Sequence, residues 1–326
     1  MKLVTYQAES GPRLGAMAPG GGVLDLAGAC ERLGGGGAAF ASMQALIDAG
    51  DGAWDEARTV IAKRPDEAMV SGEARLLAPL PKPIRLRDCS LFLEHMEKAL
   101  VQMARNLAAQ EPDPEAAFEG LMASGQYDLK PIFKQQVVYY NSNHLAVSGP
   151  EVDIVWPDYS DWIDYELEWA CVIGRTGSDI TQDRARDHIF GLTIFNDWSA
   201  RDVQIPVMDA RLGPGEGKDF DNGNGLGPCI ATPDEFDDPY ALTMTARVNG
   251  EEWSRGSTST MHHSFEDAVV QFSRRKTLRA GEVIGSGTVA SGCGFELGRR
   301  LAIGDLVELE IENIGVLRNR VVGRPA

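Results

Sequence analysis

Three acidic side chains lie in a stretch whose pattern would bring them together. Glu166 and Glu168 are two residues apart in the apolar, strand-like run 165–174, and side chains at this spacing project from one face of a strand. Asp197 follows a second strand-like run, 192–195, which can pair with the first and bring it to that face. Carboxylates this close repel one another unless a cation lies between them, and Mg²⁺ and Ca²⁺ prefer oxygen ligands. The stretch therefore predicts a metal site.

The alternative interpretation of two glutamates at this spacing is a solvated face of an exposed strand. The residues around the pair are too apolar for an exposed edge, since they include Leu167, Trp169 and Val172. A dense polar sequence, Asn-Asp-Trp-Ser-Ala-Arg-Asp at 196–202, directly follows the second strand, and functional residues are often found at such positions. Both observations favour the metal site.

Composition limits the classes of partner. The chain has 326 residues, 43% of them hydrophobic, which is enough for a sizeable core, and a formal net charge of −17, which disfavours nucleic acid and anionic membranes as partners. The N-terminal sequence has no signal-peptide pattern, and no apolar run is long enough to span a membrane. The five cysteines form no CxxC pair, so we expect reduced thiols and a cytoplasmic protein.

The chain divides near residue 75 in our interpretation. Residues 1–75 predict a small α+β unit with short strands at 3–7, 13–17 and 23–26 and helices at 40–49 and 53–63. Three prolines, Pro79, Pro81 and Pro83, then form a stiff connector to a larger domain, 76–326.

A helix is predicted after this connector, with Ser90 as a possible cap. Its apolar residues recur at helical spacing, and they are Leu93, Met96, Leu100, Met103 and Leu107. His95 lies in this helix, where a lone histidine is commonly structural. With a second helix at 114–123, segment 96–128 forms a long helical excursion, and such insertions usually have a use. It could be a lid over the site, a dimer contact or plain packing.

Two sequences carry a family resemblance. DYELEWACVIG (164–174) and FNDWSARD (195–202) resemble the fumarylacetoacetate hydrolase family, and the resemblance extends from about Leu76 to the C-terminus. It implies an α+β, β-rich fold with a mixed β-sandwich/β-roll catalytic domain, and a small N-terminal α+β domain in members of this length. It also implies a homodimer.

The resemblance assigns roles to residues that the spacing alone does not identify. Asp88 would be a fourth metal ligand, and His95, seven residues on, the catalytic base. Glu296 would orient the imidazole, and Lys218, in the family-like GKDF sequence, would face the metal and stabilise or protonate a reaction intermediate. Two further positions resemble those that hold substrate, and they are Gln204 and Thr288.

The substrate end of the site departs from the family. Ser90 stands where members that cleave fumarylacetoacetate have a substrate-binding tyrosine, so the pocket there is either wider or filled from elsewhere. Candidates to contact substrate in that region are Tyr139, Tyr140 and Arg105, although either tyrosine could be a core residue.

These residues predict a metal-dependent hydrolase that cleaves a C–C bond in a β-diketone or acylpyruvate, with Mg²⁺ as cofactor and Mn²⁺ or Ca²⁺ as alternatives. The second hypothesis is a 2-oxo acid decarboxylase, hydratase or isomerase on the same metal scaffold. Both take a small oxo-acid or diketone substrate. A non-catalytic member of the family would need a broken metal set, and all four predicted carboxylate ligands are present.

Overall fold

A computed structural model describes residues 1–324 and organises them around two β-sheets. The larger sheet has 11 strands in the order β3-β2-β1-β13-β11-β10-β16-β5-β6, with β4 beside β1 and β7 beside β13. Its strands are β1 (Lys2–Ala8), β2 (Gly11–Met17), β3 (Val23–Asp25), β4 (Leu76–Leu77), β5 (Arg85–Cys89), β6 (Tyr139–Ser142), β7 (Val147–Ser148), β10 (Leu167–Ile173), β11 (Ile189–Asp197), β13 (Asn224–Ala231) and β16 (Glu282–Gly285).

The second sheet has five strands in the order β15-β14-β17-β18-β8. They are β8 (Ile154–Val155), β14 (Thr243–Val248), β15 (Glu251–Ser257), β17 (Leu306–Ile311) and β18 (Gly315–Val322), while β9 (Ile163–Asp164) and β12 (Ser199–Ala200) form a separate pair. The turn between β14 and β15 has positive φ at Asn249 (53°) and Gly250 (82°), as a two-residue type I′ hairpin requires.

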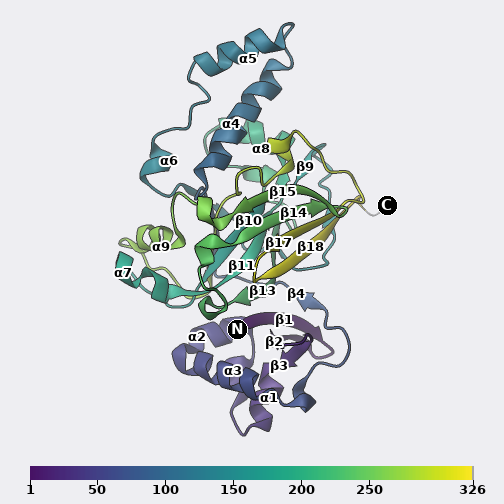
Figure 1. The fold of residues 1–326 in the computed structure, drawn as a ribbon, viewed down its shortest axis with the longest axis vertical. Coiled ribbons are helices and arrows are strands. Elements are labelled where there is room, and N and C mark those ends of the chain that lie inside the picture. Colours follow the sequence, from purple (N-terminus) through teal and green to yellow (C-terminus); the bar gives the residue numbers. More distant parts are fainter. Residues whose placement is uncertain (325–326) are drawn as a thin grey trace.

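Helices cover the ends of these sheets. They are α1 (Leu26–Arg32), α2 (Met43–Ala49), α3 (Asp51–Lys63), α4 (Leu93–Ala108), α5 (Pro114–Ala123), α6 (Ile132–Gln135), α7 (Gln182–Ala185), α8 (Arg201–Asp209), α9 (Phe265–Ser273) and α10 (Gly294–Leu297). Figure 1 shows α1, α2 and α3 gathered with β1, β2 and β3 at one end of the molecule, the other strands of the two sheets in the middle, and α4 with α5 projecting at the other end.

The fold is mixed α/β and strand-rich, which confirms the predicted class. The N-terminal strands are nevertheless not a separate sheet, because Lys2 and Leu3 of β1 pair with Ala231 and Ile230 of β13. A second core cluster joins apolar side chains of α1, α2 and α3 to side chains of the large sheet. The boundary at residue 75 stays a prediction.

The two strands expected to carry the site are neighbours, as predicted. β10 and β11 pair antiparallel, with Leu167 opposite Asn196 and Glu168 opposite Phe195. β10 begins two residues later than predicted, so Glu166 lies just before it. Side chains of these strands fill the main core, where Trp169 and Trp198 are fully buried.

One helix cap was predicted wrongly, and another helix is short. The helix after Thr181 ends at Ala185 and continues only as a 3₁₀ turn, 186–188, and the Thr181 side chain makes no capping hydrogen bond. Ser90 does not cap α4, because its hydroxyl donates to the carbonyl of Val138 at 3.2 Å, and the helix begins three residues later. Ser264 caps α9 and forms a capping box with Asp267.

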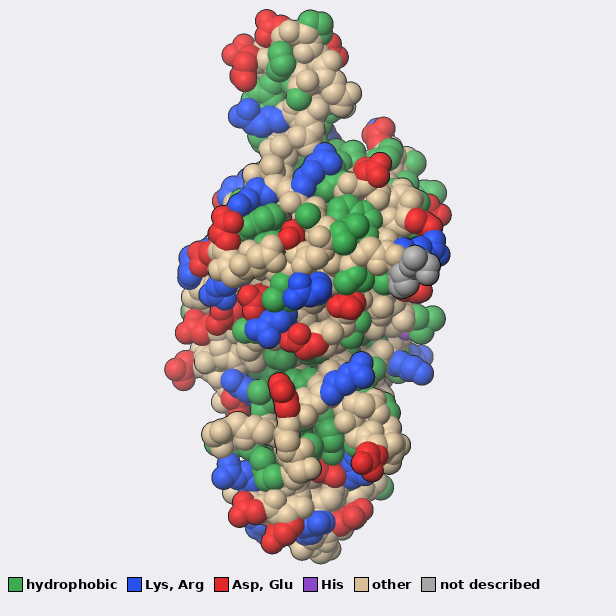
Figure 2. Space-filling view, turned by 90° about the vertical axis from the view of Figure 1, so that its right-hand side faces the viewer, with side chains coloured by type: hydrophobic (Ala, Val, Ile, Leu, Met, Phe, Trp, Pro, Cys, Tyr) green, Lys and Arg blue, Asp and Glu red, His purple; other side chains and the backbone are tan. Residues whose placement is uncertain are grey.

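The surface carries both signs of charge. On the face shown in Figure 2, acidic and basic side chains are interspersed rather than gathered in one patch of a single sign. Among residues 1–324, no helix is long and apolar enough to cross a membrane. All five cysteines are buried thiols.

Candidate active site

Three carboxylates meet where neighbouring strands of the large sheet lie side by side. Asp88 is on β5, Glu168 on β10 and Asp197 at the end of β11, and one oxygen of each lies within 4.8 Å of one oxygen of both others. β16 lies between β5 and β10 and presents Gly285 at this level, opposite Asp88. A Cβ there would lie 2.8 Å from an Asp88 oxygen, so the glycine lets the carboxylates meet across the strand.

A backbone amide ties two of these carboxylates together. The N–H of Gly287 donates to Oδ1 of Asp88 at 3.1 Å and to Oε2 of Glu168 at 3.0 Å. Gly287 has φ of +75°, and a Cβ at this position would lie 2.1 Å from the carbonyl oxygen of Cys89. Only glycine fits here without displacing the backbone.

The electrostatics of the three carboxylates fit a divalent cation. Burial, and then the charge of Asp197, raises the pKa of Asp88 to about 7. Burial and the charge of Asp88 raise the pKa of Glu168 well above its usual value, and burial also raises the pKa of Asp197. Among the described residues, Oδ1 of Asp197 is buried and has no hydrogen-bond partner. An all-oxygen donor set with an unpaired buried oxygen suits Mg²⁺ or a similar hard ion.

Glu166 is engaged differently from the other three predicted ligands. Its Oε2 lies 2.5 Å from Nζ of Lys218 and its Oε1 lies 2.7 Å from Nη1 of Arg201. Burial would raise the pKa of Glu166, but Lys218 and Arg201 hold it at about 2. The structure thus brings Asp88, Glu168 and Asp197 together and pairs Glu166 with cations. Its role as a fourth metal ligand stays a prediction.

Lys218 lies at the carboxylate cluster, where the family resemblance implied it. The side chain is 4% exposed, and Nζ lies 2.7 Å from Oδ2 of Asp197 as well as beside Glu166. Burial lowers the pKa of Lys218, but the charges of Asp197 and Glu166 outweigh this effect and raise the pKa above its ordinary value. Lys218 is therefore a fixed positive charge at the edge of the cluster.

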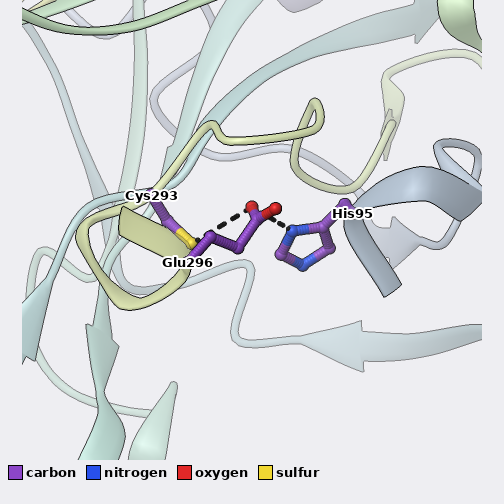
Figure 3. A group of neighbouring side chains, drawn as sticks. All are labelled: His95, Cys293 and Glu296. Atoms are coloured by element: carbon purple, nitrogen blue, oxygen red, sulfur yellow. Dashed lines mark hydrogen bonds and ion pairs between the residues drawn. The ribbon is translucent and has the colours of Figure 1, made fainter. Parts of the chain in front are cut away.

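His95 and Glu296 form the second part of the site. The histidine is on the first turn of α4 and the glutamate on α10, and Nδ1 lies 2.7 Å from Oε1, as Figure 3 shows. The second oxygen, Oε2, accepts the N–H of Ser291 at 2.9 Å. The His95 side chain is 12% exposed and Glu296 only 1%. The imidazole is also close enough to Glu166 to lower its pKa.

Two residues that sequence reasoning missed connect these parts. Asp164 accepts the backbone N–H groups of Gly294 and Phe295, each at 2.9 Å, at the start of the helix that carries Glu296. Its Oδ2 also accepts from Arg201, the residue paired with Glu166. A signal was present, because Asp164 continues the two-residue spacing of Glu166 and Glu168 and so belongs to the same face.

The residues predicted to hold substrate bond mainly to the site itself. Thr288 donates to Oε1 of Glu168 at 3.3 Å, and Oε1 of Gln204 accepts from Arg201 at 2.9 Å. The Ser90 hydroxyl is bonded to a main-chain carbonyl. Their contacts with substrate stay predictions.

The two adjacent tyrosines of β6 face opposite sides of the strand. The Tyr140 hydroxyl donates to Oδ2 of Asp197. Tyr139 packs edge-on against the ring of Phe272, with centroids 4.6 Å apart. Arg105 is exposed and lies over the ring of Phe118 on α5, 4.2 Å from its centroid. Tyr140 is therefore a neighbour of a predicted metal ligand, while Arg105 belongs to the projecting helices.

Comparison with known proteins identifies the family. The family described as fumarylacetoacetate (FAA) hydrolase C-terminal matches residues 115–322. The chain belongs to the fumarylacetoacetate hydrolase family. This confirms the resemblance found in the sequence.

Proteins similar to this chain are named for different activities. The chain is 30% identical over 266 residues to oxaloacetate tautomerase YisK of Bacillus subtilis, covering 80% of this chain and 79% of that protein. It is 32% identical over 260 residues to human mitochondrial oxaloacetate tautomerase FAHD2A, covering 74% and 81%. A fumarylacetoacetate hydrolase from Exiguobacterium antarcticum has a similar structure, with a TM-score of 0.72 at 26% identity, over 99% of this chain and 100% of that one. Membership of this family of enzymes thus leaves C–C cleavage and tautomerisation as candidate reactions.

Proposed function

We propose that this protein is a metal-dependent tautomerase of a 2-oxo acid, with oxaloacetate as the first candidate substrate. The observation that carries the proposal is the His95–Glu296 pair next to a carboxylate cluster that fits a divalent cation. The two tautomerase relatives support the choice of substrate. This choice departs from the C–C hydrolase that the sequence alone favoured.

Asp88, Glu168 and Asp197 would hold the ion, with Mg²⁺ as the first candidate, and the bound ion would polarise the 2-oxo acid and stabilise its enolate. In this arrangement Nδ1 of His95 faces Glu296, so Nε2 is the ring nitrogen available to substrate. Nε2 takes the proton from the carbon next to the carbonyl and returns it to the enolate oxygen. Glu296 fixes the ring orientation and stabilises the imidazolium formed between these steps.

Lys218 favours tautomerisation over hydrolysis. Its ammonium is clamped between Glu166 and Asp197, and these charges raise its pKa, so it is a poor proton donor. A fixed cation stabilises enolate charge without transferring a proton. Tautomerisation needs one group that removes and returns a single proton, and His95 can do both.

C–C bond hydrolysis is the second candidate, because the same pair could activate a water molecule. That reaction also needs a proton for the departing carbanion. Lys218, the predicted donor, is bound by two carboxylates, which is why we rank this reaction second.

The test uses protein stripped with EDTA and reloaded with Mg²⁺. We expect a metal-dependent acceleration of the loss of enol absorbance in fresh oxaloacetate solutions, with no release of pyruvate. A parallel panel of acylpyruvates and fumarylacetoacetate, analysed by mass spectrometry, detects C–C cleavage. Cleavage products without tautomerase activity would establish the second candidate, and full activity of the metal-free protein would refute both.

Assembly and location are separate parts of the proposal. We expect a homodimer, from the family, and a cytoplasmic protein, from the five buried thiols. Light scattering after gel filtration measures the first, and localisation of a tagged protein the second.

A further inference from the structure

A thiol lies against the histidine–glutamate pair. Sγ of Cys293 is 3.5 Å from Oε1 of Glu296, the oxygen that faces Nδ1 of His95, and Figure 3 shows the three side chains converging. One donor atom of each lies within 4.8 Å of those of both others. The mechanism above uses the imidazole and the carboxylate but has no role for the thiol.

The donor types distinguish this cluster from the carboxylate cluster. Asp88, Glu168 and Asp197 offer only oxygen, which suits hard cations. Cys293, His95 and Glu296 offer sulfur, nitrogen and oxygen, the ligand types of zinc sites with three protein ligands and one open position. Mg²⁺ has little affinity for such a set, whereas Zn²⁺ and Cd²⁺ bind thiolate and imidazole well.

Two of the three donor distances are close to what such an ion needs, and the third pair lies within 4.8 Å. With usual bond lengths, a tetrahedral Zn²⁺ ion separates its ligand atoms by about 3.3–3.6 Å. The sulfur and the carboxylate oxygen are already 3.5 Å apart, and the imidazole at 2.7 Å has to retreat by about 0.6 Å from that oxygen. A rotation of the partly exposed His95 side chain is enough for this.

The scaffold around the cluster is fixed. Oε2 of Glu296 is held by the N–H of Ser291, and the Ser291 hydroxyl accepts from Lys98 of α4 at 3.0 Å. The backbone of Cys293 is bridged to Glu166. Burial raises the pKa of the Cys293 thiol, so the free protein carries a neutral thiol whose proton an incoming ion displaces.

We propose that His95, Cys293 and Glu296 form a second metal site, which binds a soft divalent ion such as Zn²⁺ or Cd²⁺ while the carboxylate cluster holds Mg²⁺. An ion there occupies Nδ1 of His95 and the carboxylate that supports it, so the imidazole no longer cycles between its protonation states. The site is therefore inhibitory. Its inhibitory effect rests on the proposed function, whereas binding of the ion does not.

Binding is tested with Cd²⁺ added to protein saturated with Mg²⁺. Cadmium thiolates absorb in the near ultraviolet, so we expect this absorbance to rise and saturate at about one Cd²⁺ per chain, since the site has one thiol ligand. Cys293→Ser should lose this absorbance. The matched control is Cys229→Ser, because Cys229 is equally buried and its sulfur donates to the Ile314 carbonyl at 3.3 Å, where a hydroxyl can replace it.

The absorbance decides whether the site exists. A band in wild type and Cys229→Ser that is absent from Cys293→Ser supports it, provided that all three proteins have the same far-ultraviolet circular dichroism and bind Mg²⁺ equally. An equal band in both variants, or no band in wild type, overturns it. If Cys293→Ser does not fold, Cys293→Ala takes its place, and a band that persists in Cys293→Ala overturns the site.

Inhibition is measured as the ratio of rates with and without Zn²⁺ at saturating Mg²⁺, each variant being its own reference. We expect Cys293→Ser to need at least tenfold more Zn²⁺ than wild type or Cys229→Ser for half inhibition. Equal sensitivity would refute the inhibitory role. A protein with no tautomerase activity would refute the proposed function, and the Cd²⁺ absorbance would still decide the site.

Discussion

Arg201 and Asp164 form a buried ion pair in which the guanidinium donates twice to one carboxylate oxygen, from Nε at 2.9 Å and from Nη2 at 2.8 Å. The same carboxylate accepts the first two amide groups of α10. Asp164 thus joins the strand that leads to the proposed metal ligands to the helix that carries Glu296. We expect it to be a positioning residue, because it reaches the proposed catalytic pair through the backbone of α10.

Asp164→Asn should therefore lower kcat and leave KM and Mg²⁺ affinity nearly unchanged. In the wild type, the two carboxylate oxygens accept the hydrogen bonds of Arg201 and of the α10 amides. The asparagine amide has one oxygen and accepts weaker hydrogen bonds, so Glu296 shifts relative to His95. We expect a loss of about tenfold in kcat, since small displacements of catalytic groups are costly. Steady-state kinetics and Mg²⁺ titration measure both quantities.

The control for this variant is Asp202→Asn. Asp202 directly follows Arg201 in the sequence, and its carboxylate accepts from the Ser160 hydroxyl and the Asp161 amide rather than from α10. If both variants lose kcat equally, Asp164 has only a general structural role.

His95 and Glu296 should act as one unit. Removal of a general base typically costs about 10²–10⁴-fold in rate. We expect His95→Gln to fall in this range, Glu296→Gln to lose somewhat less, and the double variant to be no slower than His95→Gln, because the carboxylate acts through the imidazole. Independent, multiplied losses would contradict the pairing. Calorimetry should show unchanged Mg²⁺ binding in all three, since neither residue belongs to the carboxylate cluster.

The adjacent tyrosines of β6 provide a matched pair. Tyr140 donates to the proposed metal ligand Asp197, whereas Tyr139 packs on Phe272. Groups that orient metal ligands usually contribute 10–100-fold to metal affinity. We expect Tyr140→Phe to weaken Mg²⁺ binding by about 10-fold and Tyr139→Phe to leave it unchanged, as measured by calorimetry. Weaker binding in both variants, or in neither, would contradict this orientation of β6.

Metal binding should release protons. In the metal-free protein the pKa of Asp88 is raised to about 7 and those of Glu168 and Asp197 are also raised, so the cluster holds protons near neutral pH. A cation displaces them. We expect Mg²⁺ affinity to increase as pH rises from about 6 to 8, and calorimetry in buffers of different ionisation enthalpy to show net proton release at pH 7.

The raised pKa of Asp88 also determines how the stability of the metal-free protein changes with pH. Because the folded pKa of Asp88 exceeds its unfolded value, folding favours the protonated form, and the metal-free protein loses stability as pH rises from about 4 to 7. Saturating Mg²⁺ should remove this loss. Thermal unfolding with and without Mg²⁺ across this range measures it, and an identical pH dependence in both conditions would contradict the site.

The sequence was informative where the chemistry is local. Glu166, Glu168 and Asp197 were predicted from strand periodicity alone, and β10 and β11 do pair. Spacing could not separate Glu166, which binds two cations, from the three clustered carboxylates, because Lys218 and Arg201 reach it through tertiary folding.

Site residues that lie far from Glu168 in the sequence could be predicted only from the family resemblance. Asp88 and Glu296 lie about 80 and 130 residues from Glu168, and no local pattern links them to it. The same limit applies to Cys293, whose contact with Glu296 is local but whose approach to His95 depends on how α4 packs beside α10. The cap at Ser90 failed for a similar reason, because the Val138 carbonyl, supplied by a distant segment, competes for its hydroxyl.

Substitution of Lys218 should change Mg²⁺ binding and the rate of catalysis in opposite directions. Its ammonium lies between Glu166 and Asp197 and neutralises part of the buried negative charge. Replacing it by the uncharged Lys218→Met makes the cluster more negative, so Mg²⁺ should bind more tightly, by about tenfold. The same change removes a fixed cation from the position where enolate charge develops, and loss of one such group typically costs about 10²–10³-fold in kcat. Affinity and rate should thus move in opposite directions, as measured by calorimetry and by tautomerase kinetics at saturating Mg²⁺.

The control variant is Lys218→Arg, which should retain the charge and recover part of the rate. If Lys218→Met weakens Mg²⁺ binding instead, the lysine supports the site by its packing, and its role as a stabilising charge is wrong.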